Sequence, residues 1–160
     1  MFTDIVTSTD LVGIIGDEAW SELLAWHDRE LRAAFSQHRG EEVNHTGDGF
    51  FAAFERAGDG IECAVDIQRR LARHRREHGF ALWVRIGLHL AEATRQGGNF
   101  TGRGVHVAAR VGAAAAQEEI LVTSAALEAG GQLRYGLSDP RSLTLKGVGE
   151  PVEVRAVDWR

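Results

Sequence analysis

Hydrophobic and polar residues along this chain follow two spacings, one typical of strands and one typical of helices. Short apolar runs predict strands over residues 1–6, 43–45, 50–54, 82–90, 120–122 and 152–156. Apolar residues three and four positions apart predict helices over about residues 17–37, 61–78 and 102–116, with a shorter one over 124–129. Asp17 is the expected N-cap of the first of these helices, and Gly40 follows its end. Residues 94–101 are expected to form a loop.

The order of these elements is β-α-β-β-α-β, with further α and β segments after them. This order predicts an α+β fold in which right-handed crossovers make the first and third strands neighbours in one sheet. The first strand then ends at the same edge of the sheet as the turn that joins the second and third strands. At 160 residues the chain is expected to form one domain, residues 1–160.

The turn between the second and third predicted strands contains an Asp-Gly pair, Asp48-Gly49. This is a strong hairpin signal, because glycine accepts the positive φ that such turns need. An aspartate at a turn is most often there for the turn alone. A second carboxylate, Asp4, stands in the first strand, and the predicted topology brings Asp4 and Asp48 face to face.

Composition and charge exclude several functional classes. The net charge of −5 gives no basic footprint for nucleic acid, and the basic run at residues 69–78 is interpreted as the solvated end of a helix. The single Cys63 cannot form an internal disulfide. No apolar run reaches the length of a membrane span, and no signal peptide is visible, so we expect a cytoplasmic location. Few residues precede Asp4, which suggests that more chain comes before it.

Two carboxylates at the end of a sheet suit Mg²⁺ or Mn²⁺ on a nucleoside triphosphate, because hard cations take oxygen ligands and substrate phosphates complete the shell. Two such ions can activate an attacking oxygen and stabilise a leaving one. The hydroxyl-rich segment Thr7-Ser8-Thr9 can open a helix whose first N–H groups face an anion. The alternative interpretation is a pair of unrelated turn aspartates beside an ordinary helix cap.

Five motifs carry a resemblance that covers nearly the whole chain. They are Phe2-Thr3-Asp4-Ile5, Thr46-Gly47-Asp48-Gly49-Phe50, Arg85-Ile86-Gly87-Leu88-His89, Val105-His106-Val107-Ala108-Ala109-Arg110 and Leu145-Lys146-Gly147. Each motif alone is weak, but in this order and with these gaps they resemble the class III nucleotidyl cyclase catalytic domain. The resemblance implies a ferredoxin-like core and a homodimer whose active sites lie at the subunit interface.

The resemblance also implies the metal site and the reaction. Asp4 and Asp48 would bind two divalent cations, Mg²⁺ or Mn²⁺, with the carbonyl of Ile5 near one of them. The ribose 3′-hydroxyl would attack the α-phosphorus, giving a 3′,5′-cyclic monophosphate and pyrophosphate.

Further residues are implied to contact the substrate. Arg110 from the other subunit would stabilise charge on the α-phosphate, and Arg85 and Lys146 would hold the β- and γ-phosphates. Ser8 and Thr9 are also expected at the substrate. Arg110 as a surface residue and Lys146 as an ordinary strand-end cation are the alternative interpretations.

Three positions depart from the family pattern. Asn44 stands where adenylate cyclases usually carry a base-reading lysine, and Asn99 stands where its partner aspartate is expected. His106 replaces the asparagine that orients the ribose. An asparagine amide offers both a donor and an acceptor, so an Asn44–Asn99 pair matches several base edges and base preference stays open.

These observations favour a nucleotidyl cyclase, with ATP as the expected substrate and cyclic GMP or a cyclic pyrimidine nucleotide as alternative products. A nucleotide-binding regulatory module with little turnover is the competing hypothesis, because of the three departures. A ferredoxin-like nucleic-acid binder is disfavoured, because the chain lacks the basic and aromatic sheet face of such modules.

Overall fold

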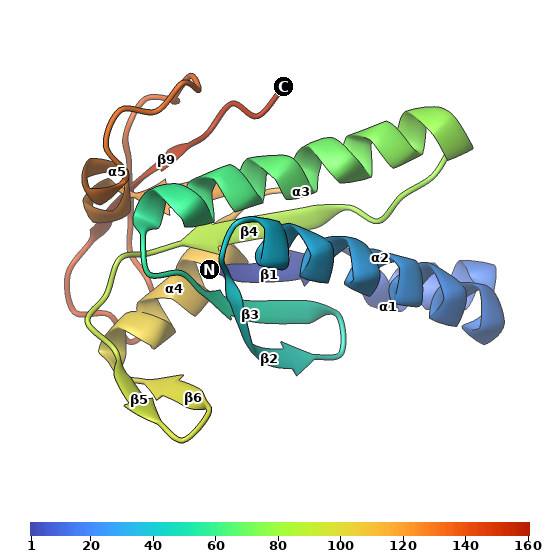
Figure 1. Ribbon diagram of the computed structural model, residues 1–160, viewed down its shortest axis with the longest axis horizontal. Coiled ribbons are helices and arrows are strands. Elements are labelled where there is room, and N and C mark those ends of the chain that lie inside the picture. Colours follow the sequence, from blue (N-terminus) through green and yellow to red (C-terminus); the bar gives the residue numbers. More distant parts are fainter.

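The computed structural model describes residues 1–160, except for the side chain of Thr9. Strands and helices follow one another as shown in Figure 1: β1 (Phe2–Ile5), α1 (Ser8–Ile15), α2 (Asp17–Gln37), β2 (Glu41–Thr46), β3 (Gly49–Ala53), α3 (Ala57–His78), β4 (Val84–Leu88), β5 (Thr94–Gln96), β6 (Asn99–Thr101), α4 (Arg103–Ala114), β7 (Ile120–Thr123), α5 (Ser124–Gly130), β8 (Arg141–Leu143) and β9 (Val152–Ala156).

The main sheet has the strand order β2-β3-β1-β4-β7-β9-β8. Strand β1 pairs antiparallel with β3 on one side and with β4 on the other, while β4 and β7 are parallel. The prediction that the first and third strands are adjacent in one sheet is therefore confirmed, and so is the predicted α+β class. The additional strands β7, β9 and β8 extend the sheet beyond the βαββαβ core.

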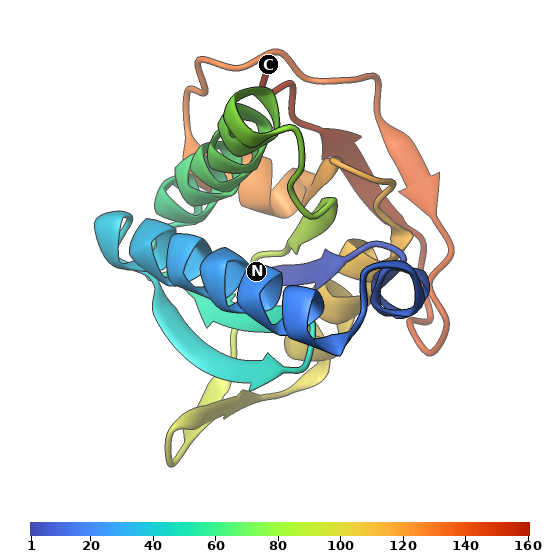
Figure 2. The same cartoon turned by 90° about the vertical axis from the view of Figure 1, so that its right-hand side faces the viewer.

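Helices cover both faces of the sheet. Figures 1 and 2 show α2 and α3 side by side over one face and α4 against the other. The larger apolar core lies under α2 and α3 and includes Leu31, Phe35, Phe50 and Ile61. A smaller core under α4 contains residues such as Val107 and Val111. Strand β7 serves both cores by alternation: Ile120 and Val122 face the first, and Leu121 faces the second.

The ends of the long helices follow from local sequence. Helix α3 stops at Gly79, which adopts a left-handed conformation (φ 79°) and donates its N–H to the carbonyl of Arg75. Basic residues in its last turn suit the negative end of the helix dipole. Arg75 is more than a solvated cation, since its guanidinium carbon lies 3.9 Å from the centre of the Trp83 ring and its side chain is paired with Glu118.

Two local predictions were wrong. Gly16, with φ 84°, is the N-cap of α2, and Asp17 is the first helical residue. The tight junction between α1 and α2 needs a positive φ that aspartate adopts less readily than glycine. Residues 94–101 form the hairpin of β5 and β6 rather than an irregular loop. Its strands have three residues each and carry almost no apolar alternation, so the pattern gave no strand signal.

Helix hydropathy in the described part of the chain gives no membrane-spanning candidate, since none of the helices is both long enough and apolar enough to cross a bilayer.

Helix α4 lies unusually close to the sheet at one point. A Cβ built on Gly87 of β4 would come within 2.1 Å of the backbone nitrogen of Gly112 in α4. Only glycine at position 87 allows this approach. The same stretch of α4 receives a hydrogen bond from β4, because Arg85 Nη1 donates to the carbonyl of Ala113 at 3.0 Å. The close approach of Gly87 and Gly112 therefore sets the position of α4 relative to β4.

We predict that Gly87→Ala destabilises the protein by about 3 kcal/mol, because the new methyl group must push backbone rather than a flexible side chain. Gly13→Ala in α1 is the control: its Cβ would meet nothing within 4 Å, so it should stabilise by about 0.5–1 kcal/mol. Denaturant unfolding of the two variants measures both changes. Equal stability of Gly87→Ala and the unmodified protein would contradict the close approach.

Candidate functional site

Asp4 lies in β1, and Asp48 lies in the turn just before the neighbouring strand β3, so both are at the same end of these paired strands. In the β1–β3 ladder Asp4 is opposite Gly49, the residue that follows Asp48. The backbone N–H of Ile5 donates to the carbonyl of Asp48 at 3.2 Å. Gly49 permits this pairing, since a Cβ there would lie 2.6 Å from the carbonyl oxygen of Thr3. The strand order thus brings together two carboxylates that are distant in sequence.

Each carboxylate is held by a side chain from a different element. Ser8 Oγ, in the first turn of α1, donates to Asp48 Oδ2 at 2.5 Å. Arg85 of β4 binds Asp4 Oδ2 through Nε at 2.7 Å and Nη2 at 2.5 Å. The side chains of Asp4 and Arg85 are 36% and 31% exposed, so this ion pair is open to solvent and to a substrate.

The turn between β1 and α1 completes this edge. Thr7 precedes the helix with φ 59°, an uncommon conformation for a residue with a branched side chain. This bend carries the chain from the buried Ile5 into α1, so that the first turn of the helix reaches Asp48. Ser8 therefore lies at the predicted site. Thr9, predicted beside it, lies outside the part of the chain whose side chains are described.

A cavity of about 370 Å³ opens beside Asp4 on the sheet face that carries α4. Its lining includes Asn44 of β2 and Asn99 of β6, so both predicted base-contacting residues share one cavity with Asp4. The rings of Phe2 and Phe51 form part of its wall and stack at a centroid distance of 4.5 Å. The arrangement provides amide groups and aromatic surface at one side and a carboxylate at the other.

The predicted residues His106, Arg110 and Lys146 lie outside this cavity. The α4 residues that line it are Val105, Ala109, Gly112 and Ala113. His106 and Arg110 are one helical turn apart on an exposed face of α4, and Lys146 is exposed in a turn after the buried Leu145. Within the described part of the chain, no hydrogen bond or ion pair engages these three side chains. In the described part of a single chain, none of the three side chains bonds to Asp4 or Asp48 or lines the cavity.

A larger cavity, of about 620 Å³, lies next to the first and shares residues such as Phe51 and Phe100 with it. Arg39 and Arg95 at its wall are engaged by Asp59 and Glu41. His89 also lines it, and burial lowers the pKa of this imidazole, which hydrogen-bonds to Thr123. Neither carboxylate lines this cavity. Asp4, but not Asp48, lines the smaller one together with Asn44 and Asn99, so the residues indicated by the sequence lie nearer to the smaller cavity.

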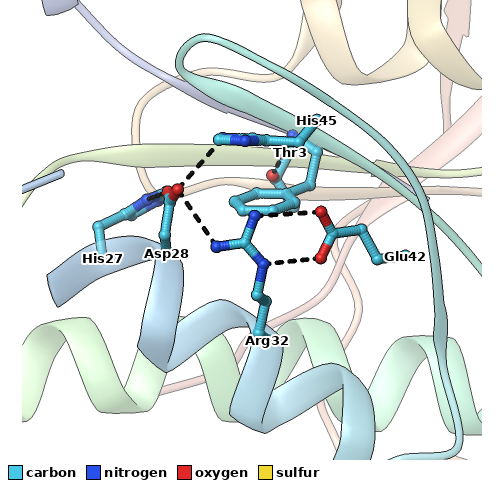
Figure 3. Close-up of polar contacts among 7 residues, drawn as sticks. Thr3, His27, Asp28, Arg32, Glu42 and His45 are labelled. Atoms are coloured by element: carbon cyan, nitrogen blue, oxygen red, sulfur yellow. Dashed lines mark hydrogen bonds and ion pairs between the residues drawn. The ribbon is translucent and has the colours of Figure 1, made fainter. Parts of the chain in front are cut away.

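Sequence reasoning missed a polar cluster on the other face of β2. Figure 3 shows His27, Asp28 and Arg32 of α2 meeting Glu42 and His45 of β2. The only advance signal was the four-residue spacing of Asp28 and Arg32, which is common on helices. The pairing across to β2 depends on the strand register, which the pattern of residues did not reveal.

Comparison with known proteins assigns the fold and family. The family model described as adenylate and guanylate cyclase catalytic domain matches residues 1–155. A Rhizobium meliloti (strain 1021) protein named "Putative adenylate cyclase 3" is 32% identical over 95 residues, which is 58% of this chain. The chain matches only 16% to 19% of the length of its curated relatives, so those proteins contain much more than this region.

Solved cyclase structures share the fold. Adenylate cyclase from Trypanosoma brucei, described in its monomeric state, is similar with a TM-score of 0.84 and 21% identity over 98% of this chain and 85% of that one. The guanylyl cyclase Cya2 gives a TM-score of 0.86 and 20% identity over 98% of this chain and 88% of that one. The fold is thus the same in an adenylate and a guanylyl cyclase, and fold similarity leaves the base preference undecided.

The Asp4–Arg85 pair gives a prediction about the site itself. In a double-mutant cycle with Asp4→Asn and Arg85→Met, we expect a favourable coupling of about 1 kcal/mol, because Nε and Nη2 both donate to one charged oxygen of Asp4 but the pair is partly exposed. The more exposed pair of Arg95 and Glu41 is the control and should show less coupling. Denaturant unfolding provides the numbers, and additive single effects at Asp4 and Arg85 would exclude the ion pair.

Proposed function

The chain belongs to the adenylate and guanylate cyclase catalytic domain family, and we propose that it converts a nucleoside triphosphate, most readily ATP, into its 3′,5′-cyclic monophosphate and pyrophosphate. The observation that carries this proposal is that Asp4 and Asp48 lie at the same end of the paired strands β1 and β3, and that Asp4 lines a cavity together with Asn44 and Asn99. We also propose that residues 1–160 act as one catalytic domain.

The residues at this edge fit divalent cations. Asp4 and Asp48 offer carboxylate oxygens, and Ile5, the residue after Asp4, offers a backbone carbonyl; these are hard ligands of the type that Mg²⁺ and Mn²⁺ take. Among the described residues no group of three or more His, Cys, Asp or Glu side chains is placed to hold a metal, so substrate phosphates would complete the shell. Two bound ions would make the 3′-hydroxyl more acidic and offset charge on the phosphates.

Arg85 has two roles in this proposal. Without substrate it neutralises Asp4, and with substrate its guanidinium turns to the β- and γ-phosphates, which are stronger multidentate acceptors. Ser8 keeps Asp48 oriented through its hydrogen bond. Thr9 is assigned to the substrate through its place next to Ser8, and Lys146 supplies a second positive charge for the phosphates.

Base recognition is assigned to Asn44 and Asn99. The side-chain carbonyl of Asn99 accepts the N–H of Phe100 at 2.9 Å, which leaves its amide N–H groups to donate. Asn44 can then present either its donor or its acceptor. This pair selects less sharply than a lysine and an aspartate would, so we expect a modest preference for adenine over the other bases.

The remaining groups are supplied by a second copy of the chain in this proposal. His106 and Arg110 are exposed on α4 and do not line the cavity beside Asp4 of their own chain. In a symmetric dimer each such face can complete the site of its partner. Arg110 would then stabilise charge on the α-phosphate, and His106 would donate an N–H to the ribose oxygen.

A nucleotide-binding regulatory module is the second candidate. Asn44, Asn99 and His106 all depart from the family pattern, and these changes weaken contacts to the base and the ribose. The two carboxylates and Arg85, which serve the metal ions and phosphates, are present and clustered. A module of this kind would bind nucleotide tightly and release no cyclic product.

The first test is direct. Purified protein is incubated with Mn²⁺ or Mg²⁺ and, separately, with ATP, GTP, CTP and UTP, and products are identified by mass. We expect cyclic AMP as the main product, and at least a 100-fold lower rate for Asp4→Asn and Asp48→Asn, because each removes one charged ligand of the ions. Tight nucleotide binding without any cyclic product would instead support the regulatory module. Near-normal turnover by either variant would exclude the two-metal assignment.

A second test addresses the shared site. Asp48→Asn and Arg110→Ala should each be inactive alone, yet an equal mixture should recover about a quarter of normal activity, because half of the dimers form one intact site out of two. Activity per chain should also fall on dilution to monomer. A mixture that stays inactive, together with dilution-independent activity of the unmodified protein, would place all catalytic groups in one chain.

A further inference from the structure

We propose that Arg32 and Asp28 of α2 act as positioning residues for base recognition: they grip β2 on both sides of Asn44 and so keep this amide turned into the cavity. The inference rests on the proposed role of Asn44 in reading the base. It adds residues on the opposite side of the sheet that never touch the substrate.

An irregularity in β2 makes such support necessary. In the β2–β3 ladder Glu42 pairs with Ala52 and Asn44 pairs with Phe51, so the register shifts by one residue at Val43. Residues paired across strands point to the same face of a sheet. Ala52 and Phe50 belong to the core under α2, whereas Phe51 lines the cavity. The bulge therefore turns Asn44 to the cavity while Glu42 and His45 face α2.

Arg32 holds the strand before the bulge. Its guanidinium binds Glu42 through two parallel contacts, Nε to Oε2 at 2.7 Å and Nη2 to Oε1 at 3.1 Å (Figure 3). The same guanidinium lies 5.0 Å from the centre of the Phe50 ring in β3. This two-pronged geometry fixes direction as well as distance, so it constrains Glu42 more than a single contact between charges would.

Asp28 holds the strand after the bulge. Its Oδ2 lies 3.4 Å from Nε2 of His45 and 3.4 Å from Nη1 of Arg32. One carboxylate therefore contacts both His45, after the bulge, and Arg32, which binds Glu42 before the bulge. Burial alone would raise the pKa of Asp28, but the hydrogen bond from His27 and the charges of His45, His27 and Arg32 together lower it. Asp28 is therefore held in its charged form.

The cluster is anchored to the rest of the sheet. The ring of His45 stacks on that of Phe50 at a centroid distance of 4.2 Å. The backbone N–H of Phe50 donates to Thr3 Oγ1 in β1, the residue before Asp4. A continuous set of contacts thus runs from α2 through β2 and β3 to the strand that carries Asp4.

Loss of the contacts between α2 and β2 would allow the bulge to disappear, and this would change the face to which Asn44 points. When part of a strand shifts its pairing by one residue, the side chains of that part move to the opposite face of the sheet. Glu42 and His45 are three residues apart, so both can face α2 only because of the bulge. If the pairing of Glu42 with Ala52 continued without the bulge, Asn44 would pair with Phe50 and leave the cavity, and His45 would leave α2. The ion pair of Arg32 with Glu42 and the packing of Asp28 against His45 oppose this slip, because both contacts form together only in the bulged register.

The test measures equilibrium binding of the α,β-methylene analogues of ATP, GTP, CTP and UTP, which bind but do not lose pyrophosphate. Base discrimination is the ratio of the weakest to the tightest Kd. We expect Arg32→Ala to reduce this ratio by about threefold to tenfold, toward the value for Asn44→Ala, and Glu42→Gln to act in the same direction. Binding of inorganic triphosphate, which has no base, should stay unchanged in both variants.

Arg141→Ala is the matched control. Arg141 pairs with Glu119 at 2.5 Å and is 45% exposed, close to the 44% of Arg32, but it lies on β8 at the far edge of the sheet. It should change neither discrimination nor triphosphate binding. The double variant Arg32→Ala/Asn44→Ala should discriminate no less than Asn44→Ala alone, because Arg32 acts only through Asn44.

Three results would overturn the inference: unchanged discrimination in both Arg32→Ala and Glu42→Gln, equal weakening of all four analogues and inorganic triphosphate, or an unmodified protein that binds every base alike. A protein that discriminates among the analogues and loses this discrimination on Arg32→Ala, yet forms no cyclic product, would refute the proposed function and support the positioning role.

Discussion

The candidate site depends on one backbone constraint, the position of β1 between β3 and β4. Antiparallel pairing on both sides places Asp4 opposite Gly49 of one neighbour and opposite Arg85 of the other. Asp48 is next to Gly49, and Ile5 bonds to its carbonyl. The carboxylates and the guanidinium therefore meet because of hydrogen bonds between main chains. Side chains add orientation to an arrangement that the ladder already determines.

One face of the sheet is packed into a core, and the other face carries the cavity of the candidate site. The face under α2 and α3 buries the larger core, whereas the face under α4 keeps a cavity beside Asp4. The close approach of Gly87 and Gly112 lets α4 pack directly against β4, the central strand of the sheet. The stacked rings of Phe2 and Phe51 form part of the cavity wall. Rigid packing on one face and an open region on the other are suited to a site that must admit a nucleotide.

Hydrogen bonds and ion pairs from neighbouring elements hold the residues of the site in place. Ser8 and Arg85 hold the two carboxylates, and the cluster around Asp28 holds the strand that carries Asn44. The exposed side chains of His106 and Arg110 have no such support within the described part of their own chain. This contrast agrees with the proposal that they work on a neighbouring copy, where their order would come from the interface.

The sequence by itself determined the order of elements, the neighbouring positions of the first and third strands, the Asp-Gly turn and the cyclase resemblance. Hydrophobic spacing and turn chemistry are local, so they are visible in the residues. Only the tertiary structure decided that Arg85 rests on Asp4, that residues 94–101 form a hairpin, and that a bulge at Val43 turns Asn44 to the cavity. These features depend on strand register and on contacts between distant segments, and a pattern of residue types does not encode register at a resolution of one residue.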